Sequence, residues 1–260
     1  MSTIYGLGPM PGTSIAHAAS MIDGETTLRH IPLLPQRGLT CQAVAYTVAH
    51  LEGVYIERGP RSWRLCPRPS LLSRQARDQV ERDRDALEAA WSGLRAPLKQ
   101  QFLGPWTLSA RLELSSGHRV LTDRYALADL RAALAGAAAA SPWDIQLDEP
   151  DLGLILGGNV PAPTAFHAID PVPAERVAAA LKQVGHQWLN LAGVPPRWWR
   201  ELCLWPQTLI VDAMDLDAAA QRLDAGLRLG VVEGHPAALS HEVGVDAEDL
   251  IDVVKRDWPA

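Results

Sequence analysis

Short apolar segments alternate with longer helical patterns along most of this chain, and this alternation limits the possible folds more than any other feature. The apolar segments have the length and composition of buried strands. Seven strands are expected, at 3–8, 29–32, 98–103, 143–147, 188–191, 209–212 and 229–232. Repeated units of a strand followed by a helix form a parallel sheet, so an α/β fold is expected.

The segments between these strands are expected to be helical, with one exception. The first helix should begin near Thr13 or Ser14, because Ser and Thr are common N-cap residues. Further helices are expected at 42–57, 74–88, 105–114, 126–140, 175–184, 218–227 and 246–258. The exception is 59–69, which should be an irregular loop because it contains three prolines.

Length and patterning favour a single domain over residues 1–260. The chain has 260 residues, of which 47% are hydrophobic, and this is enough for one large core. At this length a (β/α) TIM-type barrel is the expected architecture. An open doubly wound sheet is the alternative. Against it, neither G-x-G-x-x-G nor G-x-x-x-x-G-K-[ST] follows the first strand.

The expected barrel lacks its eighth strand, because the sequence ends just after the helix predicted at 246–258. Such a barrel would expose the edges of its first and seventh strands, 4–7 and 229–232, and proteins cover such edges. Either a segment near Trp63 supplies another strand or a second chain covers the gap. A homodimer is the favoured solution, because the Trp-rich segment 197–205 offers an apolar surface for an interface.

Charge and composition argue against several classes of partner. The net charge of −6 does not suit nucleic acid, whose phosphates need basic surfaces. No apolar segment is long enough to span a bilayer, and no signal peptide is visible at the N-terminus. The three cysteines, Cys41, Cys66 and Cys203, are far apart, which is typical of free thiols in a cytoplasmic protein.

Two adjacent carboxylates, Asp148 and Glu149, follow the strand predicted at 143–147. Pro150 ends that strand because it lacks a backbone donor and restricts the residue before it. The acids should therefore lie at the carboxyl end of a parallel strand, where α/β proteins bind ligands. The alternative is that one acid caps the next helix while the other faces water.

Four short motifs spread over most of the chain are Gly8-Pro9-Met10-Pro11-Gly12-Thr13, Leu33-Leu34-Pro35-Gln36-Arg37-Gly38, Gly104-Pro105-Trp106-Thr107-Leu108 and Gln146-Leu147-Asp148-Glu149-Pro150. In this order they resemble cobalamin-independent methionine synthase, and they are most similar to short, single-barrel actinobacterial relatives of its C-terminal catalytic domain. The resemblance implies a barrel shared with uroporphyrinogen decarboxylases. It also implies transfer of a methyl group from a folate to a thiol held by zinc.

The resemblance assigns roles to individual residues. It implies that Asp148 binds the amino group of homocysteine with Glu149 beside it, and charge-assisted hydrogen bonding makes a carboxylate suitable for that role. Gly8, in the turn after the first strand, should line the same substrate site. His235 lies near the position of the family's general-acid histidine and is the catalytic candidate, although a histidine in a loop after a strand is often a surface residue.

The family's zinc ligands are not retained. Asn190 and Ala192 stand where the family has His and Cys, and Asp212 is the one candidate metal ligand, in place of a family Glu. Cys203 matches neither family cysteine, and His186 is too early in register. A zinc site needs three or four protein ligands, so no metal or other cofactor is expected.

Three functions are compatible with these features. The favoured one is a methionine-synthase-like protein that has lost the zinc site and binds a small amino-acid-like or folate-like molecule. The first alternative is a methyltransferase acting on homocysteine or another thiol. The second is a metal-free enzyme similar to uroporphyrinogen decarboxylase, using acids such as Asp148 and Asp212, although no nucleophile–base pair supports a specific reaction.

Overall fold

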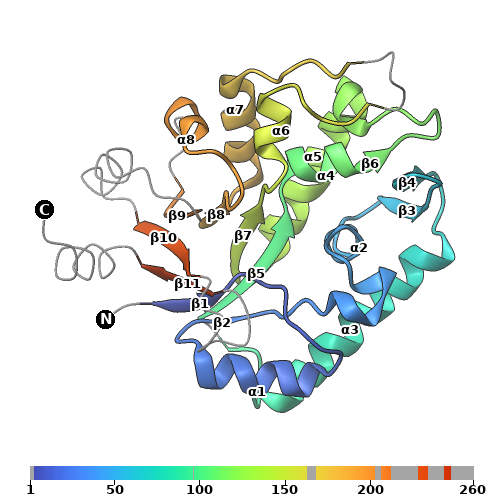
Figure 1. Ribbon diagram of the computed structural model, residues 1–260. Coiled ribbons are helices and arrows are strands. Elements are labelled where there is room, and N and C mark those ends of the chain that lie inside the picture. The colour runs from blue at the N-terminus through green and yellow to red at the C-terminus, as the bar shows by residue number, and fades with distance from the viewer. Residues whose placement is uncertain are drawn as a thin grey trace, which may run out of the picture.

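The computed structural model describes residues 3–95, 97–162, 168–202, 206–211, 228–233 and 243–246. A curled sheet of eight strands lies at its centre, with helices packed around it (Figure 1). The strand order is β1-β11-β10-β9-β8-β7-β5-β2. The bounds are β1 Ile4–Gly6, β2 Arg29–His30, β5 Leu98–Leu103, β7 Asp144–Asp148, β8 Trp188–Asn190, β9 Thr208–Val211, β10 Arg228–Glu233 and β11 Val243–Asp246. The α/β class expected from the sequence is confirmed.

The sheet is a curled parallel half-barrel with one antiparallel strand. Neighbouring strands from β2 round to β10 are parallel, but β11 runs antiparallel to both β10 and β1. The chain segments at the two ends of the strand order touch at two isolated parallel bridges, one between Tyr5 and Leu28 and one between Pro9 and Leu33. The predicted TIM-type barrel of parallel strands is therefore wrong, because an antiparallel strand lies beside the first and seventh predicted strands. Residues 234–242 are too few for the crossover of about a dozen residues that a parallel neighbour needs.

The chain itself fills the gap between the first and seventh strands. Val245 of β11 pairs with Ile4 on one side and with Val231 on the other. Asp246, predicted to open a final helix, is the last residue of β11, and 247–258 lie outside the described residues. In α8 (Arg197–Glu201) Trp199 is only 2% exposed. The homodimer was predicted from an open sheet edge and an exposed Trp-rich surface. The edge is covered by β11 and Trp199 is buried, so neither provides a surface for a second chain.

A second, three-stranded sheet occupies the region predicted to be a loop. It consists of β3 Tyr55–Arg58, β4 Trp63–Cys66 and β6 Leu112–Glu113. The hairpin between β3 and β4 is closed by a hydrogen bond of 2.8 Å from the Gly59 nitrogen to the Ser62 oxygen. The prolines at 60, 67 and 69 flank β4 and do not interrupt it, so they permit a strand there.

Most of the predicted helices are present. Ser14, Ser70 and Asp123 cap α1, α3 and α5, because their side chains accept from backbone N–H groups of the first turn. The helix predicted at 42–57 is shorter, and 218–227 lies outside the described residues. The remaining bounds are α1 Ile15–Glu25, α2 Ala43–Ala49, α3 Leu71–Ala90, α4 Pro105–Arg111, α5 Arg124–Ala140, α6 Leu152–Leu156 and α7 Ala174–Val184.

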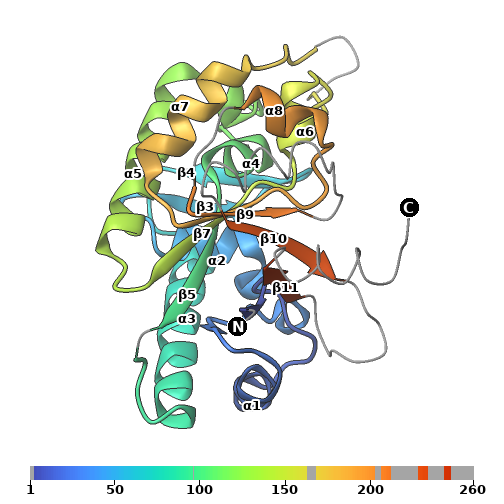
Figure 2. The same cartoon turned by 90° about the vertical axis from the view of Figure 1, so that its left-hand side faces the viewer.

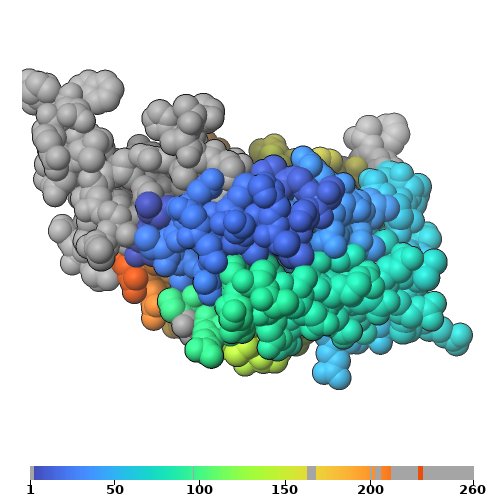
Figure 3. All heavy atoms as spheres, turned by 90° about the horizontal axis from the view of Figure 1, so that it is seen from below, coloured from blue at the N-terminus to red at the C-terminus, as the bar shows by residue number. Residues whose placement is uncertain are grey.

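The helices cover opposite sides of the molecule. Figure 2 shows α1 and α3 on one side and α7 and α8 on the other, and Figure 3 shows the face that α1 and α3 cover. None of the helices among the described residues is long and apolar enough to cross a bilayer.

The inside of the curled sheet is filled by its own side chains. A small apolar cluster there consists of Tyr5, Leu7, Leu28, Trp188 and Ile210. The rings of Tyr5 and Trp188 meet at a centroid distance of 4.8 Å. A Cβ atom on Gly230 would lie 1.6 Å from the Tyr5 hydroxyl, so β10 needs glycine where it faces this ring. The rings of Tyr5 and Trp188 in this apolar cluster lie next to the ammonium group of Lys99.

Candidate functional site

Neighbouring parallel strands bring polar side chains together at their carboxyl ends. The register places Leu103 of β5, Asp148 of β7 and Asn190 of β8 in one row. Side chains two residues apart on a strand share a face, so Gln146 lies on the same face of β7 as Asp148. Lys99 lies near the start of β5, and its long side chain reaches Gln146. We call Lys99, Gln146, Asp148 and Asn190 the strand-tip site.

Asp148 is the half-buried carboxylate of this site. Its Oδ1 accepts from Gln146 Nε2 at 2.6 Å and from Asn190 Nδ2 at 2.9 Å. Asn190 is fixed in turn, because its Oδ1 accepts from the Ala192 nitrogen at 3.0 Å. Among the described residues, no group donates a hydrogen bond to Asp148 Oδ2. The strands therefore hold one oxygen of the carboxylate and leave the other for a further donor.

Lys99 is fully buried beneath Asp148. Its Nζ donates to the Gly6 oxygen at 2.7 Å and to Gln146 Oε1. The ammonium group also lies 5.1 Å from the centroid of the Tyr5 ring and 5.7 Å from that of Trp188, within the range of cation–π attraction. Gln146 thus links the two charges, because its oxygen accepts from Lys99 and its nitrogen donates to Asp148.

Burial moves the pKa values of these two charged groups toward each other. It lowers the pKa of Lys99, and the negative charge of Asp148 opposes that change. It raises the pKa of Asp148, and the bonds from Asn190 and Gln146 oppose that change. Perturbed pKa values of this kind are frequent in binding and catalytic sites.

Glu149, the next residue, is fully buried against α4. Its Oε1 accepts from the Trp106 nitrogen at 2.9 Å and its Oε2 from the Thr107 nitrogen at 2.6 Å. These N–H groups belong to the first turn of α4, where helices lack internal acceptors and favour negative charge. Burial raises the pKa of Glu149 to about 7, and its bonds with Thr107 and Trp106 oppose this. The geometry favours a capping role for Glu149.

Gly8 has a structural reason to be glycine. Its φ is 122°, and a Cβ atom there would lie 2.6 Å from the side chain of Gln101. Its carbonyl oxygen accepts from the Leu33 nitrogen at 2.8 Å. Pro9 and Asp148 border a cavity of about 30 Å³ beside it, which is room for about one water molecule. Gly8 thus lies near Asp148 and positions β1 against Gln101.

The catalytic candidate His235 and the metal-ligand candidate Asp212 lie outside the described residues, as does Cys203. His186 precedes β8, and burial lowers its pKa to about 4. The structure therefore brings Gly8 and Asp148 near one another, and directs Glu149 to α4.

The residues at positions 190 and 192 do not fit the family's zinc. Asn190 is bonded to Asp148 and to the Ala192 backbone, and the methyl group of Ala192 offers no donor atom. Zinc takes thiolate, imidazole or carboxylate ligands. Within the part of the chain that the structure describes, no three His, Cys, Asp or Glu side chains are placed to hold a metal ion.

Lys99 was not predicted as a site residue, although the sequence carries a signal for it. Lys99 lies within the predicted strand 98–103, whose residues are all buried. A lysine in such a strand requires partners, because an isolated buried charge is very costly. Its spacing from Gln101 would have placed it on the inner face.

Comparison of the chain with protein-family models finds no match, and comparisons with curated proteins and with solved structures find none either. The class of this protein is therefore defined by its fold and by the chemistry of its site. The chain is an α/β protein with a buried polar network at the carboxyl ends of its parallel strands.

Proposed function

We propose that this protein is a methionine-synthase-like α/β protein without the zinc site, and that it binds a small amino-acid-like ligand through Asp148. The ligand's ammonium group would donate to Asp148 Oδ2. The observation that carries the proposal is the fixed orientation of this carboxylate. Two side-chain amides hold Oδ1, while no described residue donates to Oδ2.

The position of the carboxylate supports this proposal. It lies at the carboxyl ends of parallel strands, which is the usual ligand-binding edge of an α/β fold. A charge-assisted hydrogen bond to an ammonium group is strong where the pair is partly shielded from water. Burial raises the pKa of Asp148, and an added cation would stabilise its ionised form.

Asn190 supports the loss of the zinc chemistry. Its amide is occupied by Asp148 and by the Ala192 backbone, so a metal at this position would have to break both hydrogen bonds. The methyltransferase alternative lacks this support.

The test is the binding of L-methionine, measured by calorimetry with the parent protein and with Asp148→Asn. The substitution keeps the shape of the side chain and should weaken binding by about 2 to 5 kcal/mol, the usual effect of removing one member of a buried charged pair. An analogue of methionine without the amino group should bind equally weakly to both proteins.

Asp144→Asn is the matched control. Asp144 is exposed at the opposite end of the same strand, so its substitution should leave affinity within about twofold of the parent. If Asp148→Asn binds L-methionine as tightly as the parent, the ammonium role of Asp148 is wrong.

A second candidate is a metal-free enzyme of the kind represented by uroporphyrinogen decarboxylase. The observation that favours it is the linkage of Lys99 to Asp148 through Gln146, with both pKa values displaced toward neutrality. Release of carbon dioxide from uroporphyrinogen, abolished by Asp148→Asn, would establish this activity. No release from the parent protein would exclude it for that substrate.

A further inference from the structure

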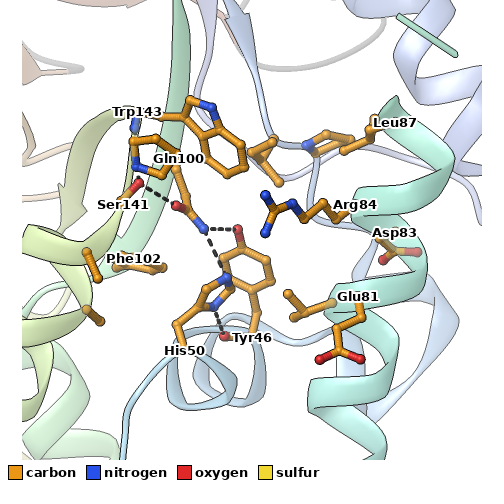
Figure 4. Close-up of a pocket in the computed structure, with 16 residues that line it drawn as sticks. Tyr46, His50, Glu81, Asp83, Arg84, Leu87, Gln100, Phe102, Ser141 and Trp143 are labelled. Atoms are coloured by element: carbon orange, nitrogen blue, oxygen red, sulfur yellow. Dashed lines mark hydrogen bonds between the residues drawn. The ribbon is translucent and has the colours of Figure 1, made fainter. Parts of the chain in front are cut away.

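A separate groove lies on the other side of β5, between α2, α3 and α5. Its volume is about 240 Å³. Gln100 of β5 lies on this side, whereas Lys99 faces the strand-tip site, because neighbouring strand residues point to opposite faces. Figure 4 shows Tyr46, His50, Arg84, Gln100 and Trp143 around the hollow. The groove is thus independent of the site proposed above.

The polar groups at the base of the groove are bonded to one another. Gln100 Nε2 donates to the Tyr46 hydroxyl oxygen and contacts His50 Nε2, each at 3.0 Å. Gln100 Oε1 accepts from Ser141 Oγ at 3.0 Å. Because the Gln100 nitrogen is a donor, His50 Nε2 accepts, and His50 Nδ1 then donates to the Tyr46 carbonyl oxygen at 2.9 Å. Burial lowers the pKa of His50, which favours this neutral form; the hydrogen bond to the Tyr46 carbonyl opposes this change, and the positive charge of Arg84 adds to it.

Two donors remain for a ligand. The Tyr46 hydroxyl accepts from Gln100, and nothing among the described residues accepts its own proton. Arg84 has no carboxylate partner in the described part of the chain, and its guanidinium stacks over Trp143 at 5.7 Å from the ring centroid. Figure 4 shows the guanidinium and the Tyr46 hydroxyl both directed into the hollow. Paired donors of this kind suit a carboxylate.

The two acids on the rim do not compete for these donors. Asp83 accepts from Arg37 at 2.7 Å and from Gln79 at 2.9 Å, so its charge is already paired. Glu81 is exposed and points away from the Arg84 guanidinium in Figure 4. The positive charge of Arg84 is therefore available inside the groove.

The rest of the wall is apolar and in part aromatic. The apolar side chains that line it are Ile31, Pro32, Val80, Leu87, Phe102, Pro142 and Trp143. A cavity of about 150 Å³ holds a benzene ring, so about 240 Å³ holds one ring with a short acidic side chain. Flat apolar walls next to Arg84 favour a planar ring that carries a negative charge.

We propose that this groove binds a small aromatic carboxylate, with the carboxylate between Arg84 and the Tyr46 hydroxyl and the ring against the apolar wall that includes Leu87 and Trp143. Gln100 acts as a positioning residue, because it fixes the Tyr46 oxygen and orients the phenol. The ligand's acidic group and its ring are both required.

Phenylacetate, phenylacetamide and acetate are the probes, with binding followed by chemical-shift changes in NMR spectra of the full chain. Phenylacetate should bind, while phenylacetamide, which lacks the charge, and acetate, which lacks the ring, should each bind about tenfold more weakly or worse. Arg84→Gln and Tyr46→Phe should weaken phenylacetate binding by about tenfold and about fivefold, while phenylacetamide should respond little to Arg84→Gln.

Arg82→Gln is the matched control, because Arg82 is an exposed arginine of the same helix that does not line the groove. It should change phenylacetate affinity by less than about twofold. Arg84 is also exposed, so its substitution should leave folding intact. The proposal is overturned if phenylacetate does not bind at millimolar concentration, or if Arg84→Gln binds it no more weakly than Arg82→Gln does.

Discussion

At the scale of single residues, the strand-tip site depends on a lysine that is stable in the interior only because it has partners. Lys99 is surrounded by the Gly6 carbonyl, Gln146 and two aromatic rings. Burial lowers its pKa from 10.5, so between neutral pH and about pH 10 the folded state binds fewer protons at Lys99 than the unfolded state does. Stability contributed by this group therefore rises with pH across that range.

Lys99→Met should remove this rise. As the pH is raised above 7, the free energy of unfolding of the parent should increase relative to that of Lys99→Met. The difference should grow by up to about 1.4 kcal/mol per pH unit. Urea denaturation at pH 7, 8 and 9 measures the difference. Lys182→Met, at an exposed lysine of α7, should keep the pH dependence of the parent. Equal slopes for the parent and Lys99→Met would show that Lys99 titrates normally.

At the scale of secondary structure, strands that are buried on both sides could be predicted from the sequence, whereas strands defined by their partners could not. β5 and β7 agree with their predictions to within a residue, because Gly104-Pro105 and Pro150 mark where these strands end. β4 was predicted as an irregular loop because prolines surround it, and a strand near Trp63 was offered only as an alternative that would complete the barrel, whereas β4 belongs to the second sheet. β11 was missed because Val243–Asp246 has no pattern of its own and is defined by pairing with β1 and β10.

Close contacts between strands are equally hard to predict from the sequence. A Cβ atom on Gly6 of β1 would lie 2.1 Å from the ring of His30 on β2. Gly6→Ala should lower the free energy of unfolding by about 1 to 3 kcal/mol, because the ring or the strand must move. Gly136→Ala, in α5 where the added methyl group meets nothing, should raise it by about 0.5 to 1 kcal/mol. Thermal denaturation compares the two, and a neutral Gly6→Ala would contradict this packing.

β11 provides a test of how the sheet is completed. Its backbone pairs with strands on both sides, so Val245→Pro removes a sheet hydrogen bond and should cost about 3 kcal/mol or more. The exposed edges of β1 and β10 should then promote association, seen by light scattering. Val245→Thr keeps the backbone donor and should behave like the parent. Unchanged stability of the proline variant would mean that β11 does not complete the sheet.

At the scale of the whole molecule, the alternation of strands and helices predicted the α/β class, and the position of Asp148 at the end of β7 followed from it. The closure by an antiparallel strand did not follow, because it depends on a connection too short for a helix. The site was predictable only in part. Asp148 was recognised because it lies near Pro150. The parts played by Lys99 and by Asn190, which donates to Asp148, could be predicted only with the register of three strands.

The central claim is that Asp148 binds an amino-acid ammonium group without zinc. Calorimetric titration of L-methionine into protein dialysed against a chelator tests it most directly. We expect the chelator-treated protein to bind L-methionine as tightly as the untreated protein does, and added zinc to leave the affinity unchanged. In Asp148→Asn the binding free energy should weaken by about 2 to 5 kcal/mol. Binding that disappears with the chelator and returns with zinc would contradict the claim, and would favour the zinc-dependent methyltransferase.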